Sequence, residues 1–443
     1  MQNQETSNFQ KFSQWLRQSL FVKLAAIGFL ILLLMIPQSM IQSLVHERQH
    51  RQREVVQEVS SAWGAPQTII GPVLSIPYTR WTEPDGKRIR VQEVAHFLPV
   101  RLEIEGQAPH QIRQRGIFSV ILYQAELSLE GIFARPDFAS LHIDPADVQW
   151  EQAKLSVGIS GMTGIKSSIE VDWNDSRHRL EPGTAYPDIL PAGVSIGIPI
   201  APNTEGYTFR IPVKVNGSDF LQFEAVGKET TLRLQSDWPS PGFSGSFLPD
   251  QRAVSEQGFS AVWQVLDLNR NYPQSWKNNQ YRLGDTAFGV RFVQPVDEYA
   301  KNSRSAKYAV LVIVLTFLIY FFFETLRRFH VHPFQYLLVG LAISVFYLLL
   351  LSLSEHIGFN YAYLCSTIAT VGLIVFYSAS VLKIRRLVIQ LALLLIAIYS
   401  FIFIILQLED YALLAGSLGL FMALAAVMYY SRRVDWYNPG ASS

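Results

Sequence analysis

Three residues near the start of the chain match a known catalytic arrangement. His46, Glu47 and His50 form the pattern His-Glu-x-x-His. When such a segment is helical, the two histidines lie four residues apart on one face and hold zinc, while the glutamate acts as a general base. The pattern raises the hypothesis of a zinc-dependent membrane hydrolase that uses these three residues.

The surroundings of this motif argue against a metal centre. Residues 46–60 are highly charged and predict a solvated helix with only one narrow apolar edge. Arg48 places a cation beside the two histidines, where it would weaken metal binding. The nearest further carboxylates, Glu54 and Glu58, lie on the same helix and cannot fold around one ion. We therefore predict no metal, no cofactor and no catalytic residue, and keep the hydrolase as an alternative.

Two other segments carry residues suited to binding. Glu355 and His356 lie in a short polar loop between two apolar runs, where they could bind a metal or a lipid headgroup; we favour hydrogen bonds to the base of the large insert. Trp238, Phe243 and Phe247 lie in a segment dense in turn-forming residues. We interpret it as a structural turn that buries the three rings, with a binding loop as the alternative.

Other chemistry-bearing patterns are missing from the sequence. It contains no nucleophile elbow, no P-loop and no glycine-rich dinucleotide fingerprint after a predicted strand. Basic patches with interleaved aromatic residues are also missing, so we predict no nucleic-acid partner.

The elements that position these residues follow from the distribution of apolar runs. One run lies at Leu20–Ile36, and five more follow after an insert of about 260 residues. Each is about 16 to 24 residues long, which is enough to cross a bilayer as a helix. The sequence therefore predicts an α-helical bundle of six spans. The five later runs are Tyr308–Leu326, Phe334–Leu353, Phe359–Leu382, Leu387–Leu406 and Tyr411–Tyr430.

The first run is interpreted as a retained signal anchor. Lys23 lies near its start, and we expect this side chain to extend to the lipid headgroups. Pro37 closes the apolar stretch, and the residues after it contain no small-x-small cleavage pattern.

The basic residues of the short segments predict an orientation. Ten lysines and arginines lie on one side of the spans, whereas the short loops 354–358 and 407–410 have none and hold Glu355, Glu409 and Asp410. Because basic loops stay in the cytoplasm, we predict that both termini are cytoplasmic and that the insert lies outside. The ten residues are Lys11, Arg17, Lys23, Arg327, Arg328, Lys383, Arg385, Arg386, Arg432 and Arg433.

The interiors of the later spans do not favour transport. A transporter should place ionisable or helix-breaking residues near the bilayer midplane. Lys307 and Glu324 instead lie at the ends of their runs. Ala415, Gly419 and Ala423 give the last run a face of small residues suited to helix packing. A transporter of a lipid or of an envelope precursor is kept as an alternative.

The large insert has the composition of β-structure. Nineteen of the 22 prolines lie between His46 and Ala300, and short alternating stretches recur between turn residues. We expect a mainly-β, antiparallel sandwich, or two of them. The single cysteine, Cys365, lies in a span, so no disulfide is expected in the insert. The predicted strands are Arg88–Val94, Glu126–Ile132, Lys154–Ile159, Tyr207–Val215, Lys228–Leu234 and Phe259–Leu266.

These observations give a plan of the chain. The segment 181–206, rich in proline and glycine, is a candidate internal boundary or a long crossing loop. The net charge of +1 averages a membrane part and an aqueous part, so it says little about partners. The predicted parts are a cytoplasmic segment at 1–19, a first span at 20–45, a β-rich domain at 46–304, a five-span bundle at 305–431 and a cytoplasmic tail at 432–443.

Five segments resemble a known family. They are Gly71–Tyr78, Trp238–Pro249, Pro295–Tyr299 leading to Arg304–Tyr308, His332–Gly340 and Ser352–Phe359. Together with the order of one span, a large insert and five spans, they make the chain similar to the CreD family of bacterial inner-membrane proteins, often described as cell envelope integrity proteins. The likeness includes Glu47, Arg48 and Gln49 but not His46 and His50, and this departure weakens the zinc hypothesis.

The resemblance implies a setting without an assigned reaction. It implies a multi-pass protein of the bacterial inner membrane with a periplasmic insert. It also links the chain to a two-component regulatory system, to colicin tolerance and to envelope and β-lactam responses. We therefore expect a non-enzymatic protein that supports envelope integrity and the stress response. Its expected partners are the lipid bilayer and an unknown envelope protein or cell-wall component, which the periplasmic domain binds.

Overall fold

The computed structural model describes residues 20–82, 89–202, 204–294, 298–327, 331–408 and 411–432. The chain folds into two compact units, a β unit at Arg53–Pro295 and a helical unit made by the residues before and after it. Several residues on which the predicted orientation rests lie outside the described residues. Segment 1–19 and nearly all of the predicted tail lie outside them as well. These orientation residues are Lys11, Arg17, Arg328, Glu409, Asp410 and Arg433.

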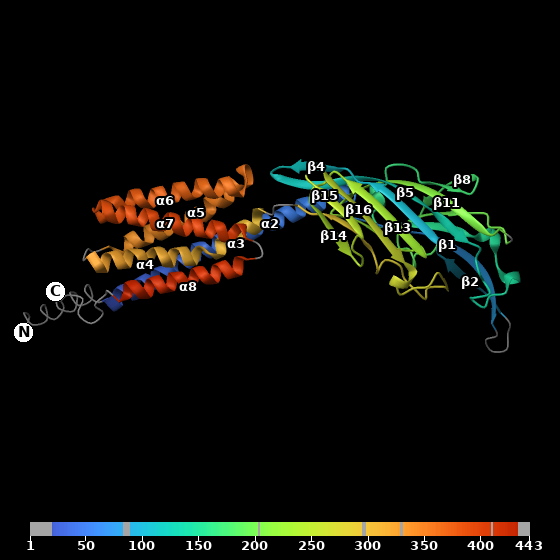
Figure 1. Ribbon diagram of the computed structural model, residues 1–443, viewed down its shortest axis with the longest axis horizontal. Coiled ribbons are helices and arrows are strands. Elements are labelled where there is room, and N and C mark those ends of the chain that lie inside the picture. Colours follow the sequence, from blue (N-terminus) through green and yellow to red (C-terminus); the bar gives the residue numbers. More distant parts are fainter. Residues whose placement is uncertain are drawn as a thin grey trace, which may run out of the picture. The chain divides into compact units, whose positions relative to one another are not determined.

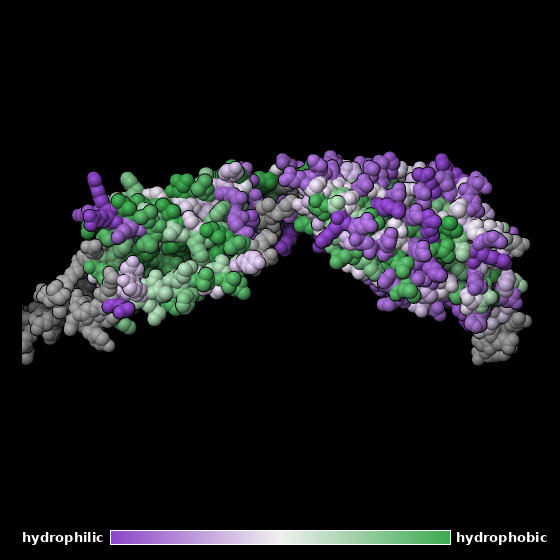
Figure 2. Space-filling view, viewed as in Figure 1, coloured by the Kyte–Doolittle hydropathy of each residue, from purple (hydrophilic) through white to green (hydrophobic). Residues whose placement is uncertain are grey.

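The helical unit confirms the predicted spans. The described residues contain six helices that are long and apolar enough to cross a membrane, with α3 and α4 counted as one. Figure 2 shows apolar side chains covering most of the visible surface of these helices. The helices are α2 (Leu20–Trp63), α3 (Glu298–Lys307), α4 (Ala309–Arg327), α5 (Pro333–Ile357), α6 (Phe359–Leu382), α7 (Arg385–Gln407) and α8 (Ala412–Ser431).

Helix α2 is longer than the apolar run that predicted it. It has 44 residues and continues through Pro37 to Trp63. Proline inside a helix removes one backbone hydrogen bond, and neighbouring helices can compensate for that loss in a membrane. The charged segment 46–60 is helical, as predicted.

Lys23 forms an ion pair that the sequence did not predict. Its Nζ lies 2.9 Å from Oε1 of Glu324 in α4, a side chain that is only 4% exposed. Tyr336 in α5 donates a hydrogen bond to Oε2 of the same carboxylate, at 3.2 Å. A buried carboxylate without a partner is costly, so the nearby ammonium group is drawn to it. This ion pair joins the first span to α4.

Helix α8 contacts α7 at Gly419, one of the three small residues of the predicted packing face. A Cβ atom built on Gly419 would lie 2.0 Å from the ring of Phe401 in α7. Only glycine therefore allows the ring to approach the backbone of α8 this closely.

The β unit is built from two sheets of nine strands each, whose strands are visible in Figure 1. The first sheet runs in the order β14-β18-β12-β1-β6-β10-β9, with β2 beside β1 and β17 beside β2. The second runs in the order β15-β16-β13-β3-β5-β11-β7-β8, with β4 beside β5. Short 3-10 turns occur at Pro145–Asp147, Trp150–Gln152, Met162–Gly164 and Asp267–Asn269.

The strands have the following bounds. In the first sheet they are β1 (Gln67–Thr82), β2 (Ile89–Phe97), β6 (Lys154–Ile159), β9 (Glu181–Pro182), β10 (Gly193–Gly197), β12 (Phe220–Phe223), β14 (Pro241–Gly245), β17 (Ser275–Lys277) and β18 (Phe288–Phe292). In the second sheet they are β3 (Arg101–Gln107), β4 (His110–Arg115), β5 (Phe118–Ala134), β7 (Glu170–Trp173), β8 (Ser176–Arg179), β11 (Gly206–Ser218), β13 (Glu229–Ser236), β15 (Gln251–Ser255) and β16 (Gly258–Leu266).

All six predicted strands are present, in β2, β5, β6, β11, β13 and β16. Arg88, the predicted start of the first, lies outside the described residues. The sheets are mixed and not purely antiparallel as expected, because β1 pairs with β12 and β3 with β13 in parallel. These partners lie far apart in the sequence, and local alternation carries no information on strand direction.

One hydrophobic core fills the β unit. It contains buried residues from both sheets, such as Leu155 and Leu129, and from both sides of segment 181–206, such as Val171 and Val213. That segment supplies β9 and β10 to the first sheet. The proline- and glycine-rich segment therefore lies within one core and does not separate two.

Candidate ligand-binding face

The His-Glu-x-x-His residues lie on α2 with exposed side chains. His46, Glu47 and His50 are all on the surface of the helix. Arg48 lies 3.8 Å from Glu355 in α5, so it forms an ion pair within the helical unit. Among the described residues, no group of three or more histidine, cysteine or carboxylate side chains is placed to hold a metal ion. The hydrolase hypothesis stays a prediction.

Glu355 and His356 lie in the last turn of α5 and not in a loop, which corrects the sequence interpretation. Tyr299 of α3 donates a hydrogen bond to Oε1 of Glu355 at 3.0 Å. The same oxygen forms the ion pair with Nε of Arg48. His356 is exposed and hydrogen-bonds through Nδ1 to the carbonyl oxygen of Ser352 at 3.1 Å. Glu355 therefore ties together α2, α3 and α5.

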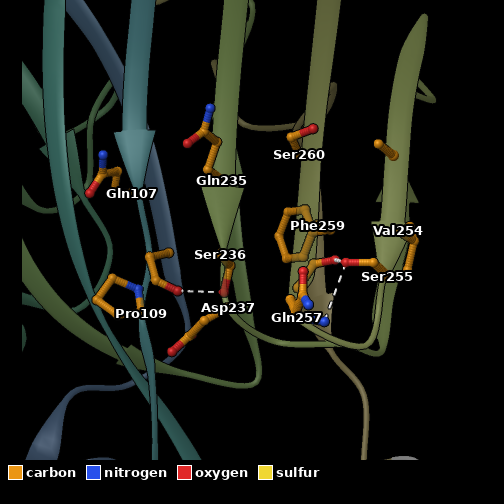
Figure 3. Close-up of a pocket in the computed structure, with 13 residues that line it drawn as sticks. Gln107, Pro109, Gln235, Ser236, Asp237, Val254, Ser255, Gln257, Phe259 and Ser260 are labelled. Atoms are coloured by element: carbon orange, nitrogen blue, oxygen red, sulfur yellow. Dashed lines mark hydrogen bonds between the residues drawn. The ribbon is translucent and has the colours of Figure 1, made fainter.

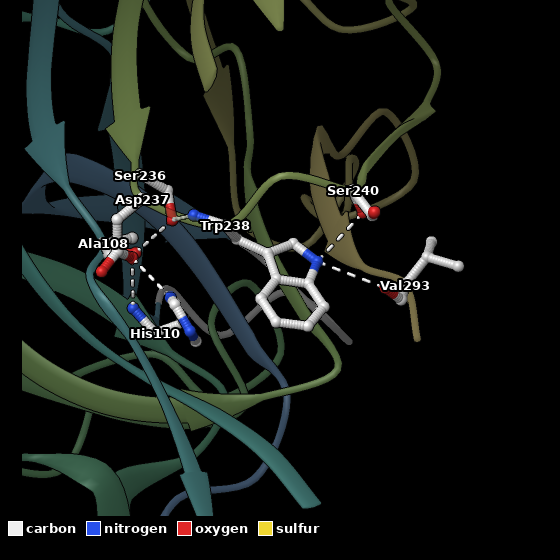
Figure 4. Close-up of polar contacts among 7 residues, drawn as sticks. All are labelled: Ala108, His110, Ser236, Asp237, Trp238, Ser240 and Val293. Atoms are coloured by element: carbon white, nitrogen blue, oxygen red, sulfur yellow. Dashed lines mark hydrogen bonds and ion pairs between the residues drawn. The ribbon is translucent and has the colours of Figure 1, made fainter. Parts of the chain in front are cut away.

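The three aromatic residues after β13 pack against the β core. The Trp238 side chain is buried, and its indole N–H donates to the carbonyl oxygens of Ser240 at 3.0 Å and Val293 at 3.2 Å (Figure 4). Phe243 lies edge-on to Phe259, with ring centroids 5.7 Å apart, and belongs to β14. Phe247 packs edge-on against the buried ring of Phe288 at 5.5 Å. All three rings thus anchor the strand connection.

Asp237, directly before this segment, is held by His110 at the start of β4. The backbone N–H and the ring Nδ1 of His110 each lie 2.8 Å from Oδ1 of Asp237 (Figure 4). Burial by itself would raise the pKa of this carboxyl group, but the hydrogen bonds from His110 bring it below its ordinary value. Asp237 is therefore a fixed, ionised carboxylate at this end of the second sheet.

A shallow hollow of about 580 Å³ opens beside Asp237 (Figure 3). It runs over the ends of β3 and β13 to the β15–β16 hairpin. The aromatic ring in its lining, Phe259, is only 5% exposed. Three glutamines and three serines supply most of its polar atoms: Gln107, Gln235, Gln257, Ser236, Ser255 and Ser260.

A second hollow of about 470 Å³ continues from the first, because Gln107 and Gln235 line both. Its other polar residues include two ion pairs, Lys214–Glu126 at 2.9 Å and Arg233–Glu105 at 3.4 Å. We call the two hollows together the polar face. Strand pairing places one row of its side chains on five neighbouring strands, about 19 Å from end to end. This row is Ser260, Gln235, Gln107, Glu126 and Lys214.

The chemistry of the polar face suits a ligand without a strong net charge. Asp237 adds one negative charge to the first hollow. The charged side chains of the second hollow neutralise one another in pairs. The amides and hydroxyls both donate and accept hydrogen bonds. Sequence reasoning missed this face because scattered glutamines form no motif; the only local signal was the alternation that puts Arg233 and Gln235 on the polar side of a strand.

Comparison with known proteins identifies the relatives of the chain. The family described as inner membrane protein CreD matches residues 19–437. This chain belongs to the CreD family. The inner membrane protein CreD of Escherichia coli (strain K12) is 32% identical over 433 residues, which cover 95% of each of the two chains. Family membership and the six apolar helices together indicate a multi-pass inner-membrane protein.

The segments that carried the CreD resemblance lie in both units. Gly71–Tyr78 forms the buried middle of β1, and Trp238–Pro249 contains β14. His332–Gly340 begins α5, with His332 as its N-cap, and Ser352–Phe359 ends that helix. Within Pro295–Tyr299, residues 295–297 lie outside the described residues.

Proposed function

We propose that this CreD family member is a non-enzymatic protein that supports envelope integrity, and that its β unit lies in the periplasm and binds another envelope component. The helical bundle anchors the β unit to the inner membrane. The polar face is the surface through which binding occurs.

The observation that carries this proposal is the polar face itself. Two adjoining hollows, of about 580 and 470 Å³, lie on a sheet whose opposite side packs into the core. A rigid sheet holds the amides and hydroxyls at fixed spacing, so a ligand finds preorganised hydrogen-bonding groups and less entropy is lost on binding. The two ion pairs of the second hollow add selectivity for a complementary ligand, because paired charges attract free ions only weakly.

Photo-crosslinking in living cells tests the proposal. A photoreactive amino acid at Gln107 or Gln235 should capture an envelope component, because both residues line both hollows. Gln114 and Gln264 are exposed glutamines of the same sheet that do not line the polar face, and they serve as matched control positions.

The paired variant Gln107→Ala/Gln235→Ala extends the test to function. It should fail to restore detergent resistance to cells that lack the protein and need it for that resistance, whereas Gln114→Ala/Gln264→Ala should restore it. Equal capture at all four positions, together with full restoration by both variants, would show that the polar face has no binding role.

A further inference from the structure

We infer that the component bound at the polar face is a protein, and that an extended segment of it adds as a new strand to β15. This inference rests on the proposed function and specifies the class of partner. It rests on three observations: no described strand pairs with the outer edge of β15, the other strands that end the main paths are protected, and the side chains around β15 suit a peptide.

Strand β15 ends the second sheet, and all five of its residues are exposed. A two-residue turn joins β15 to β16, so Ser255 pairs with Gly258. Ala253 and Gln251, two and four residues earlier, face β16 in the same way as Ser255. In an antiparallel hairpin, alternate residues exchange hydrogen bonds with the neighbour. The N–H and C=O groups of Val254 and Arg252 therefore point away from β16, toward the open side.

The other three strands that end the main paths of the sheets are protected against such pairing. β8 carries Arg177, His178 and Arg179, and β9 has two residues, one of which is Pro182. β14 begins with Pro241 and contains two glycines. Proteins commonly protect edges with charge, proline and short strands. β15 has one charge, Arg252, whose guanidinium lies 6.0 Å from the ring centre of Phe243.

The side chains beside β15 favour an alternating peptide. On one side of the sheet Val254 is 51% exposed and lies opposite Phe259. On the other side lie Ala253 and Ser255, and these two residues line the larger hollow together with Val254. A peptide strand would place apolar side chains next to Val254 and polar ones toward the hollow. A glycan would gain less, because the ring of Phe259 is buried and cannot stack on a sugar.

The variant Val254→Pro tests this inference in the full-length protein. Proline removes the outward N–H of residue 254 and leaves the pairing with β16 in place. A photoreactive amino acid at Gln257, in the turn beside β15, reports on occupancy in cells. The matched control Val254→Ala keeps the N–H and shortens the side chain. We expect a protease-sensitive adduct whose yield falls at least fivefold in Val254→Pro and less than twofold in Val254→Ala.

The other outcomes are equally informative. A protease-sensitive adduct with equal yield in both variants would overturn strand addition. An adduct that resists protease and is released by muramidase would mean a glycan partner; it would overturn this inference and leave the proposed function standing. Failure to capture anything at Gln257, Gln107 and Gln235 would overturn both. If Val254→Pro lowers the thermal midpoint of the protein, Arg252→Pro replaces it, because its N–H also points outward.

Discussion

Replacing His96 with glutamine is expected to remove a pH-dependent part of the stability of the β unit. His96 lies in β2 and is 1% exposed. Its Nδ1 is 2.8 Å from the hydroxyl of Ser75 in β1, and the rings of Trp276 and Tyr186 pack against it. Burial lowers the pKa of the imidazole from 6.5 to about 4.

The direction and size of the effect follow from proton linkage. Between pH 6.5 and 4 the unfolded chain binds a proton at this histidine and the folded chain does not, so stability falls as the pH falls. One pKa unit corresponds to about 1.4 kcal/mol, which gives a total loss of about 3 kcal/mol and about 2 kcal/mol by pH 5. Above pH 7 the contribution is complete.

Unfolding of the full-length protein in detergent, followed by tryptophan fluorescence, measures this effect. Seven of the nine tryptophans lie in the β unit, so the signal reports mainly on that unit. We expect the free energy of unfolding of the wild-type protein to fall by about 2 kcal/mol more between pH 7 and pH 5 than that of His96→Gln. His178→Gln, in the short strand β8, is the matched control and should keep the wild-type slope.

One result would refute the reasoning. If wild type and His96→Gln lose the same free energy between pH 7 and pH 5, the buried imidazole is not the source of the pH dependence. Measurements stop at pH 4.5 because carboxylates with a lowered pKa, such as Asp237, begin to lose their contribution as the pH falls further.

Two predictions concern the helical unit. Lys23→Ala should destabilise the protein by about 2 to 4 kcal/mol, because it leaves the carboxylate of Glu324 buried without its cation. Denaturation in mixed micelles should show a smaller loss of stability for the double variant Lys23→Ala/Glu324→Ala. Equal losses for the two variants would mean that the pair does not interact. Gly419→Leu should lower the thermal midpoint by several degrees, because its Cβ would meet the ring of Phe401 at 2.0 Å. The control Gly416→Leu has open space around its Cβ and should leave the midpoint nearly unchanged. Similar midpoints for both variants would show that α8 does not contact α7 here.

The candidate site shows how far local patterns reach. The alternation along β13 places Arg233 and Gln235 on one exposed side of the strand. The pattern could not show that Gln107 lies beside Gln235, because the two residues belong to strands 128 positions apart that pair in parallel. The His-Glu-x-x-His motif drew attention to α2, yet the contact found there is made by Arg48, with Glu355 as its partner.

The sequence by itself determined the six spans and six of the strands. Helix length and apolar content set the six spans, since a span depends only on its own residues and the thickness of the bilayer. The alternation of apolar and polar residues set the six predicted strands, because one side of such a strand faces the core. This pattern, too, depends only on the residues of the strand itself. Only the tertiary structure decided the order and direction of the strands, the partner of Lys23 and the assembly of the polar face. These features join residues that are distant in the chain, and their energies depend on burial and on partners that no local stretch of sequence contains.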